Sequence, residues 1–137
     1  MAATNEHVHA TGKIDVQKYE PTPYDQPADG PALFRIHVEE SFSGDISGSG
    51  VAEFLQTARS ESEASFVGVE RVTGTLGGRA GTFVFQDQGT LKDSTVSGTW
   101  FVAPGSGTGE LAGLRGEGGF TAALGQSAEI TLDYWFE

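Results

Sequence analysis

Glu70 is the residue whose type and position most favour chemistry. From Phe66 to Leu76, apolar or small residues occupy every second position, and Glu70 falls in the same series as Val72. Side chains two residues apart point to one face of a β-strand. A carboxyl group held among apolar neighbours has a raised pKa and can act as a general acid or base near neutral pH. Glu70 is therefore the first candidate catalytic residue.

Arg79 is the second candidate, because it lies among small residues in Gly78-Arg79-Ala80-Gly81. Small neighbours leave room for its guanidinium group to reach a carboxylate, either that of Glu70 or that of an acidic ligand. A Glu70–Arg79 pair could serve catalysis or could brace the fold, and both hypotheses stay open. A surface cation at a hairpin is the third interpretation.

Several further residues are candidates for ligand contacts inside the fold. Aromatic side chains on strands more often pack a core than bind a ligand. Glu53 and Glu110 lie on predicted strands, and each could also face water. The candidate ligand-binding set is Gln86, Trp100, Tyr134, Phe66 and Glu53.

No metal or cofactor site is expected. His7 and His9 would share one side of a strand, but Thr11, Gly12 and Lys13 follow them where a metal site needs a further ligand. The segment Ala103 to Leu111 is rich in glycine, yet it lacks the lysine and the following helix of a phosphate-binding loop. It is interpreted as a wide hairpin turn.

The elements that must position these residues are predicted to be β-strands throughout. Phe34, Ile36, Val38 and Phe42 alternate with polar residues, and glycine pairs mark tight turns between such segments. Sequential antiparallel pairing in a single domain follows. The rival to a closed barrel is a two-sheet sandwich, since alternation alone does not distinguish them. The predicted strands cover 7–16, 33–42, 45–56, 64–76, 80–88, 93–103, 108–116, 117–123 and 130–136.

Two segments depart from the pattern. Residues 51–58 contain good helix formers, so a short helical turn is the alternative to a strand there. Residues 17–31 contain four of the five prolines and show no alternation, which predicts a long loop. Long loops in compact domains are often lids or binding loops. A lid over one barrel mouth is the functional hypothesis, and a plain surface excursion is its alternative.

Charge and composition limit the partners. The 137 residues carry a formal net charge of −11 and no cysteine. A strongly acidic surface repels phosphate backbones and anionic lipid heads, so neither nucleic acid nor a membrane is expected as a partner. Basic or neutral ligands suit this charge better. The lack of cysteine and of an export signal favours a cytoplasmic location.

Two segments resemble the core signature of the DUF3224 family. They are FVGVERVTGTLGGRAGTFVFQDQG at 66–89 and VSGTWFVAPGSGTGELAGLRGEGGF at 96–120. The motifs Glu-Arg-Val at 70–72, Gly-Thr-Leu at 74–76, Gly-Arg at 78–79 and Ser-Gly-Thr-Gly-Glu-Leu at 106–111 occur in order at family-like spacing. One departure concerns Asp87, which stands where the resemblance leads us to expect a histidine.

The resemblance implies a closed, antiparallel, eight-stranded barrel similar to allene oxide cyclases and dirigent proteins, with a ligand-sized lumen and a tendency to form dimers or trimers. It does not imply a reaction, because one fold hosts many functions. Our hypothesis is a cofactor-independent isomerase or cyclase that acts on an apolar polyene, epoxide or polyketide-like molecule. The alternative is a non-catalytic carrier or an oligomeric structural barrel.

Overall fold

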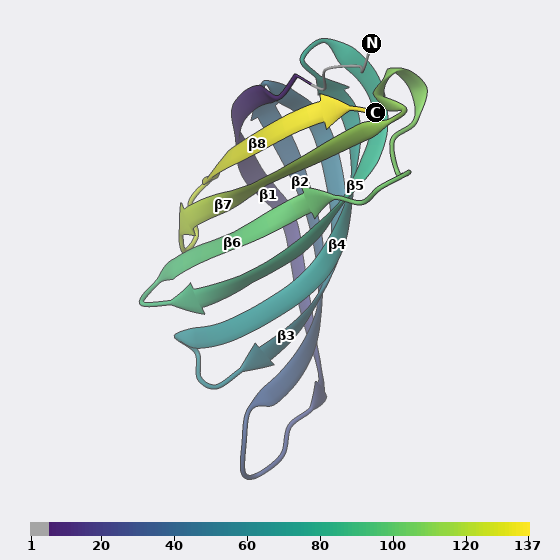
Figure 1. Cartoon of the computed structure of the whole chain (residues 1–137). Helices are drawn as coiled ribbons and strands as arrows, with labels where there is room; N and C mark the ends of the chain where they lie inside the picture. The colour runs from purple at the N-terminus through teal and green to yellow at the C-terminus, as the bar shows by residue number, and fades with distance from the viewer. Residues whose placement is uncertain (1–5) are drawn as a thin grey trace.

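The chain folds as a closed barrel of eight antiparallel strands in sequential order, as the family resemblance implies. The computed structural model describes residues 6–137. A short 3₁₀ helix, η1 (Gly109–Leu111), follows β6, and none of the described helical segments is long and apolar enough to cross a membrane. The strands in Figure 1 are β1 (Val8–Asp25), β2 (Ala32–Gly44), β3 (Ile46–Ala58), β4 (Glu63–Leu76), β5 (Arg79–Lys92), β6 (Thr95–Val102), β7 (Leu114–Ala123) and β8 (Ala128–Phe136).

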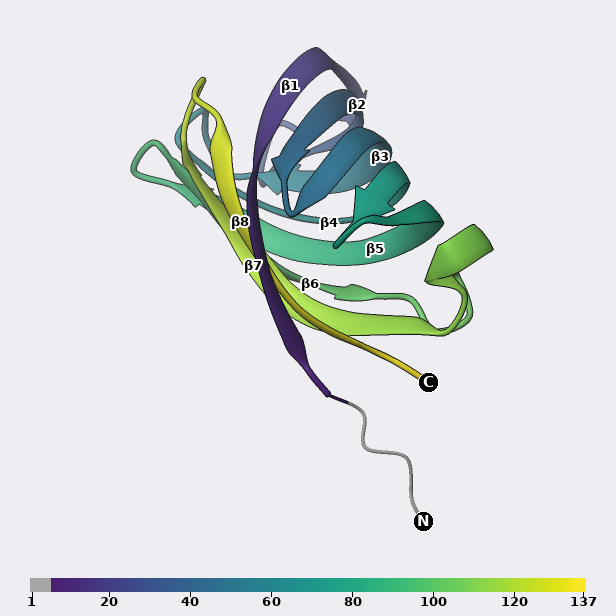
Figure 2. The same cartoon turned by 90° about the horizontal axis from the view of Figure 1, so that it is seen from above.

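The wall closes where β1 pairs with β8. The register runs from Val8 opposite Tyr134 to Ile14 opposite Ala128, and Figure 2 shows β1 returning beside β8. Closure gives every strand a partner on both sides over part of its length, which excludes the sandwich. Residues 51–58 belong to β3 and pair with both β2 and β4, so the helical alternative is also excluded.

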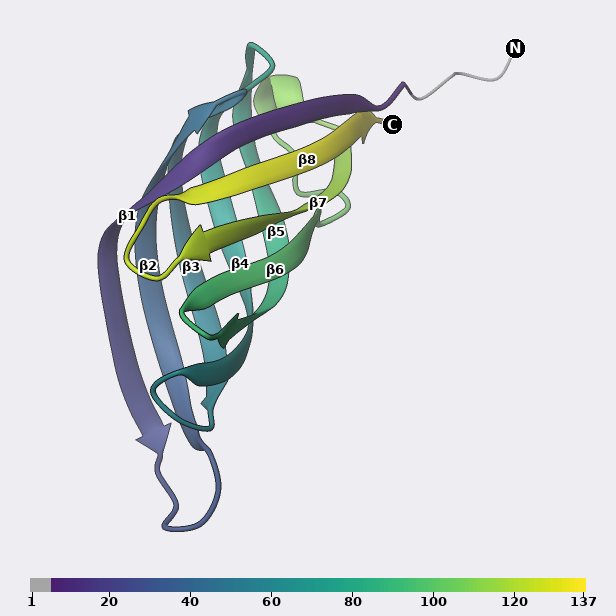
Figure 3. The same ribbon diagram turned by 90° about the vertical axis from the view of Figure 1, so that its left-hand side faces the viewer.

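The prediction of a loop at 17–31 is wrong for most of its length. Strand β1 continues to Asp25, so only residues 26–31 connect it to β2. The outer part of β1 pairs with β2 alone, and Figure 3 shows this hairpin extending beyond the other strands. Proline is tolerated on an edge strand, where the missing N–H removes no ladder hydrogen bond. Pro21 and Pro23 lie on this edge.

The prediction of two strands at 108–116 and 117–123 is also wrong. Residues 114–123 form the single strand β7, and the segment before it contains η1. Gly109 and Gly113 have φ angles of 61° and 85°, which suit glycine and end the extended conformation. The loop packs back on β5, where Thr82 donates its backbone N–H to the Thr108 hydroxyl group at 3.1 Å.

The interior is filled at one end and hollow at the other. The filled end lies near the two termini, and its side chains are buried in one cluster that includes Ile46, Leu76, Phe83, Leu111 and Leu114. The hollow end lies near the β3–β4, β5–β6 and β7–β8 turns, at the lower end of the barrel in Figure 1. The boundary between the two ends is the level at which the candidate site lies.

Candidate functional site

Three acidic side chains from three strands meet inside the barrel. Glu40 extends from β2, Glu70 from β4 and Asp87 from β5, and each follows the inward alternation of its strand. Glu70 is 1% exposed, Asp87 6% and Glu40 9%. Acidic residues are seldom buried to this extent without a cation as partner. We refer to Glu40, Glu70 and Asp87 as the acid cluster.

Gly50 on β3 makes space for the acid cluster. Strand β3 lies between β2 and β4, and Gly50 pairs with Glu40 on one side and with Val72 on the other. A Cβ atom at Gly50 would lie 2.3 Å from Oε2 of Glu70 and 2.8 Å from Cε1 of Phe42. The Glu70 carboxyl group thus occupies the volume that a side chain at position 50 would fill.

Burial raises the pKa of all three carboxyl groups, and the charges of neighbouring acids raise the pKa of Glu70 and Asp87 further, whereas the hydrogen bond with Glu70 lowers the pKa of Glu40. Desolvation is the largest cause in each case. The pKa of Glu70 is raised well above its ordinary value, with a further contribution from a hydrogen bond to Glu40. The pKa of Asp87 is raised to about 7, with the charge of Glu40 as the second cause. The acid cluster therefore retains at least one proton near neutral pH.

The acid cluster has no basic partner among residues 6–137. The ion pairs found in this part of the chain all lie elsewhere, and Oε2 of Glu70 and Oδ1 of Asp87 are buried without a hydrogen-bond partner. A buried polar atom left unpaired costs about 1–3 kcal/mol. Such atoms mark positions where a ligand can supply the missing contact.

A cavity of about 540 Å³ adjoins the acid cluster, which forms its floor, and opens at the hollow end of the barrel. Its wall is mainly apolar and aromatic. Phe54 and Phe66 meet edge to face at 5.4 Å between ring centroids, and Trp100 lies 5.1 Å from Phe120. Trp100 is held in place because its Nε1 donates a hydrogen bond to the carbonyl oxygen of Thr131 at 3.0 Å. The size and lining are those of a small-molecule site.

Comparisons with known proteins agree with the barrel and its sequence signature. The family model described as "Protein of unknown function (DUF3224)" matches residues 10–134. The chain belongs to the DUF3224 family. A DUF3224 protein of unknown function from Shewanella oneidensis MR-1 has a similar crystal structure, with a TM-score of 0.81 and 31% sequence identity over 96% of this chain and 99% of that one. No curated protein matches the sequence.

In this DUF3224 barrel, three of the sequence-predicted residues line the cavity. Glu70 lies at its floor, Trp100 beside the floor and Phe66 in the wall. Tyr134 is inside the barrel but belongs to the filled end, where its ring meets Phe136 edge to face at 6.1 Å. Its side chain faces the interior, as predicted, but it lies outside the cavity.

The predicted pair of Glu70 with Arg79 does not form. Glu70 pairs in register with Phe85, whereas Arg79 is at the first position of β5, opposite Leu76. Arg79 is exposed, and its guanidinium carbon lies 4.1 Å from the centroid of the Phe136 ring. It neither braces the buried acid nor reaches the cavity.

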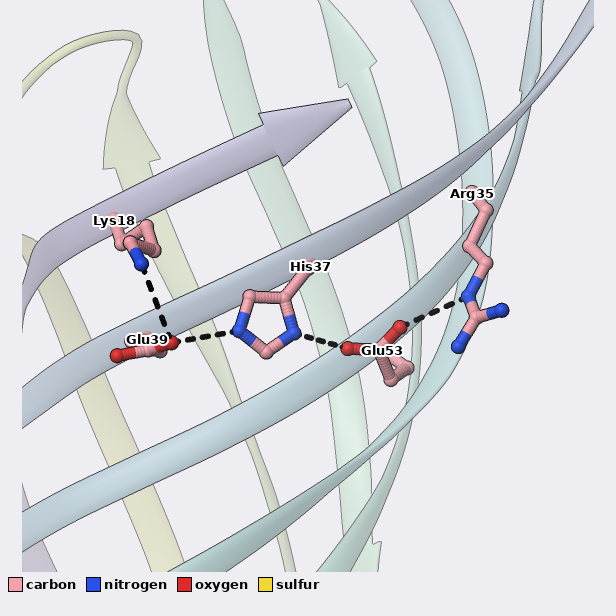
Figure 4. A network of polar contacts seen from close by, with 5 residues as sticks. All are labelled: Lys18, Arg35, His37, Glu39 and Glu53. Carbon is pink, nitrogen blue, oxygen red and sulfur yellow. Dashed lines mark hydrogen bonds and ion pairs between the residues drawn. The ribbon is translucent and has the colours of Figure 1, made fainter. Parts of the chain in front are cut away.

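Gln86 and Glu53 lie on the outside of the wall. The prediction that Gln86 faces the lumen is wrong, and Glu53 follows the alternative in which it faces water. Gln86 alternates with the inward residues Phe85 and Asp87. Glu53 belongs to the polar network in Figure 4, where Arg35 donates its Nε–H to Oε1 of Glu53 at 3.0 Å and His37 contacts both Glu53 and Glu39. These contacts raise the pKa of His37, with the hydrogen bond to Glu39 as the largest cause. The network spans the outer surface of β2 and β3.

The remaining candidates are also on the surface. His7 stacks on Trp135, and Nδ1 of His9 lies 2.6 Å from Oδ1 of Asp133. Glu110 accepts a hydrogen bond from the backbone N–H of Ala80. Within residues 6–137 no group of three or more His, Asp or Glu side chains is arranged to hold a metal ion.

Glu40 and Asp87 are site residues that the sequence analysis did not select. The alternation of inward and outward residues along a strand indicates both positions. Glu40 lies between Val38 and Phe42 in the inward series of β2, and Asp87 follows Phe83 and Phe85 in that of β5. Each is an acid at a position that the pattern assigns to the core.

Proposed function

We propose that the cavity binds a small, largely apolar molecule and that the acid cluster catalyses its isomerisation or cyclisation without a cofactor. The observation that carries the proposal is the position of Glu70, a buried carboxyl group at the floor of a cavity of about 540 Å³. A carboxyl group with a raised pKa keeps its proton near neutral pH and can donate it to a substrate.

Shape contributes to this mechanism as well as proton transfer. The aromatic wall formed by Phe54, Phe66, Trp100 and Phe120 holds a flexible substrate in a folded conformation close to the reactive one. Glu70 donates a proton to a developing negative charge or to an epoxide oxygen. Glu40, which shares a hydrogen bond with Glu70, or Asp87 accepts a proton later in the reaction.

The test is turnover by the Glu70→Gln variant. The purified protein is incubated with a panel of uncharged conjugated polyenes, epoxides and polyketide-like molecules, and the products are identified by chromatography with mass spectrometry. We expect isomerised or cyclised products from the unaltered protein and at least a hundredfold lower rate from Glu70→Gln. Glu117→Gln, an exposed acid on β7, is the matched control and should retain full activity.

Binding distinguishes the two functional alternatives. A glutamine has the shape of a protonated glutamate, so Glu70→Gln should keep its fold and its affinity for the neutral molecules of the panel, measured by quenching of tryptophan fluorescence. If ligands bind but return unchanged across the whole panel, the protein is a carrier and the catalytic proposal fails.

The proposal includes association into a dimer or trimer. Leu55, Val67, Val69 and Phe101 lie on the outer face of strands β3, β4 and β6 and are each about half exposed. Contact between copies would remove this apolar surface from water. Light scattering coupled to size-exclusion chromatography measures the mass, and a mass equal to that of one chain at all concentrations contradicts this part of the proposal.

A further inference from the structure

We propose that the ligand of the cavity carries a protonated basic nitrogen that binds to Glu40, Glu70 and Asp87, with an apolar body that fills the space above them. This inference rests on the proposed function because it requires that the same cavity binds a small molecule. It adds the chemical class of the ligand.

The charge of the lining is the first argument. The charged residues that line the cavity are all acidic, because Asp15 near the mouth joins Glu40, Glu70 and Asp87, and lysine, arginine and histidine are absent from the lining that the structure describes. Tyr19 is the other titratable group there, and desolvation raises its pKa. A carboxylate or phosphate ligand would meet like charges, whereas an ammonium or amidinium group meets opposite ones.

The unpaired oxygen atoms are the second argument. Oε2 of Glu70 and Oδ1 of Asp87 both lack a hydrogen-bond partner, and both residues line the cavity floor while nine-tenths or more of each is buried. Both oxygen atoms are buried, so the two carboxyl groups would turn toward the cavity to accept charge-assisted hydrogen bonds from the several N–H groups of a cationic ligand. Such bonds are shorter and stronger than neutral ones. An epoxide or ketone oxygen could accept a proton from one carboxyl group but would leave the other oxygen atoms unpaired.

The aromatic wall is the third argument. Trp100 pairs directly with Asp87 across β5 and β6, so its indole ring lies next to the carboxyl group that would bind the nitrogen. Phe85 covers one face of this ring, with 3.9 Å between the parallel ring centroids, so the indole offers a cation its other face. Phe54, Phe66 and Phe120 line the space above, where they suit an apolar body.

The proton balance connects this ligand to the proposed chemistry. One carboxyl group of the acid cluster ionises and pairs with the nitrogen, and its proton goes to solvent. A second carboxyl group keeps its proton and is free to donate it. Because the bound cation favours ionised carboxylates, the affinity should rise with pH through the pH range in which Asp87 ionises, around pH 7.

The test compares three probes that share a naphthyl group and are similar in size, by titration calorimetry with the full chain. They are 2-(2-naphthyl)ethylamine, 2-(2-naphthyl)ethanol and 3-(2-naphthyl)propanoate, which are cationic, neutral and anionic at pH 7.5. We expect the amine to bind at least tenfold more tightly than the alcohol and the carboxylate to bind most weakly. The advantage of the amine should shrink at pH 5.5, where Asp87 is protonated.

Two variants locate the effect. Asp87→Asn and Glu70→Gln should each reduce the preference for the amine at least fivefold while the affinity for the alcohol stays within twofold, and Glu117→Gln should leave both unchanged. Retained affinity for the alcohol also shows that a variant is folded.

The outcomes separate the two proposals. If the alcohol binds as tightly as the amine, or if the preference for the amine survives both variants, the ligand class proposed here is wrong and the binding cavity of the proposed function stands. If none of the three probes binds, as judged also by NMR shift changes at millimolar concentration, both proposals fail.

Discussion

Glu70 keeps its carboxyl group in the interior because the chain has no side chain at the adjacent position of β3. Gly50 is the residue that permits this arrangement. A Cβ atom added at this position would lie only 2.3 Å from Oε2 of Glu70. Glycine costs stability within a strand. At this position the glycine leaves room for a buried acid.

We predict that Gly50→Ala displaces the Glu70 carboxyl group and lowers the free energy of unfolding by about 1–3 kcal/mol, as overpacking of a core does. Urea denaturation measures the change. Ser49→Ala, on the exposed side of the same strand, is the control and should change stability by less than about 0.5 kcal/mol. Equal stability of the two variants would show that the interior at Gly50 is not tightly packed.

The acid cluster was partly predictable from single residues. Alternation placed Glu70 on the inward face of 66–76, and this is confirmed. The same rule applies to Glu40 and Asp87. The sequence could not show whether Arg79 reaches Glu70. Contact between two side chains requires that both lie at the same level along the barrel axis. That level depends on the register of every strand pair.

At the scale of the element, the outer half of β1 stands out because one of its edges is unpaired. Strand β8 pairs with β1 only as far as Ile14, while β2 accompanies β1 up to Asp25. Unpaired N–H and C=O groups on such an edge invite pairing with another chain. Pro21 and Pro23 remove two of the N–H groups and make the edge a poorer template.

We predict that the double variant Pro21→Thr with Pro23→Thr aggregates more readily than the unaltered protein. Threonine restores the missing N–H groups and favours extended structure. Dynamic light scattering over several days at 37 °C measures the growth of large particles. Pro104→Thr, in the exposed turn after β6, is the control. A double variant that stays as monodisperse as the control would mean that the two prolines do not protect this edge.

The presence of most strands could be predicted from the sequence better than the residues at which they begin and end. Alternation and glycine pairs identified the strands from 33 to 103 and the last strand. They failed at 17–25, because prolines normally end a regular strand and only an unpaired edge accommodates them. They failed at 108–113, where glycines with positive φ angles interrupt a pattern that otherwise suits a strand.

At the scale of the whole molecule, the acid cluster makes stability depend on pH. The folded protein holds protons that the unfolded chain releases, because burial raises the pKa of Glu40, Glu70 and Asp87. Stability must then fall as pH rises from the ordinary carboxyl pKa, about 4, through the raised values, which for Asp87 means about 7. His37, whose pKa is also raised, contributes with the same sign.

We predict a melting temperature several degrees higher at pH 5.5 than at pH 8.0, measured by differential scanning calorimetry. The triple variant Glu40→Gln, Glu70→Gln and Asp87→Asn should lose most of this difference, because its interior has nothing left to ionise. His37 is present in both proteins, so its contribution cancels in the comparison. An unchanged pH dependence in the triple variant would contradict the assignment to the acid cluster.

The division of the barrel into a filled end and a hollow end has an evolutionary consequence. Side chains such as Ile46, Leu76 and Leu114 carry the stability at one end, while residues near the mouth, such as Gln56, Leu91 and Val96, contribute little to that packing. Substitutions at the mouth can therefore accumulate without unfolding the chain. Proteins descended from one ancestral barrel could therefore come to bind different ligands through substitutions at these mouth residues. Laboratory libraries in which only these residues vary should yield a high fraction of folded proteins.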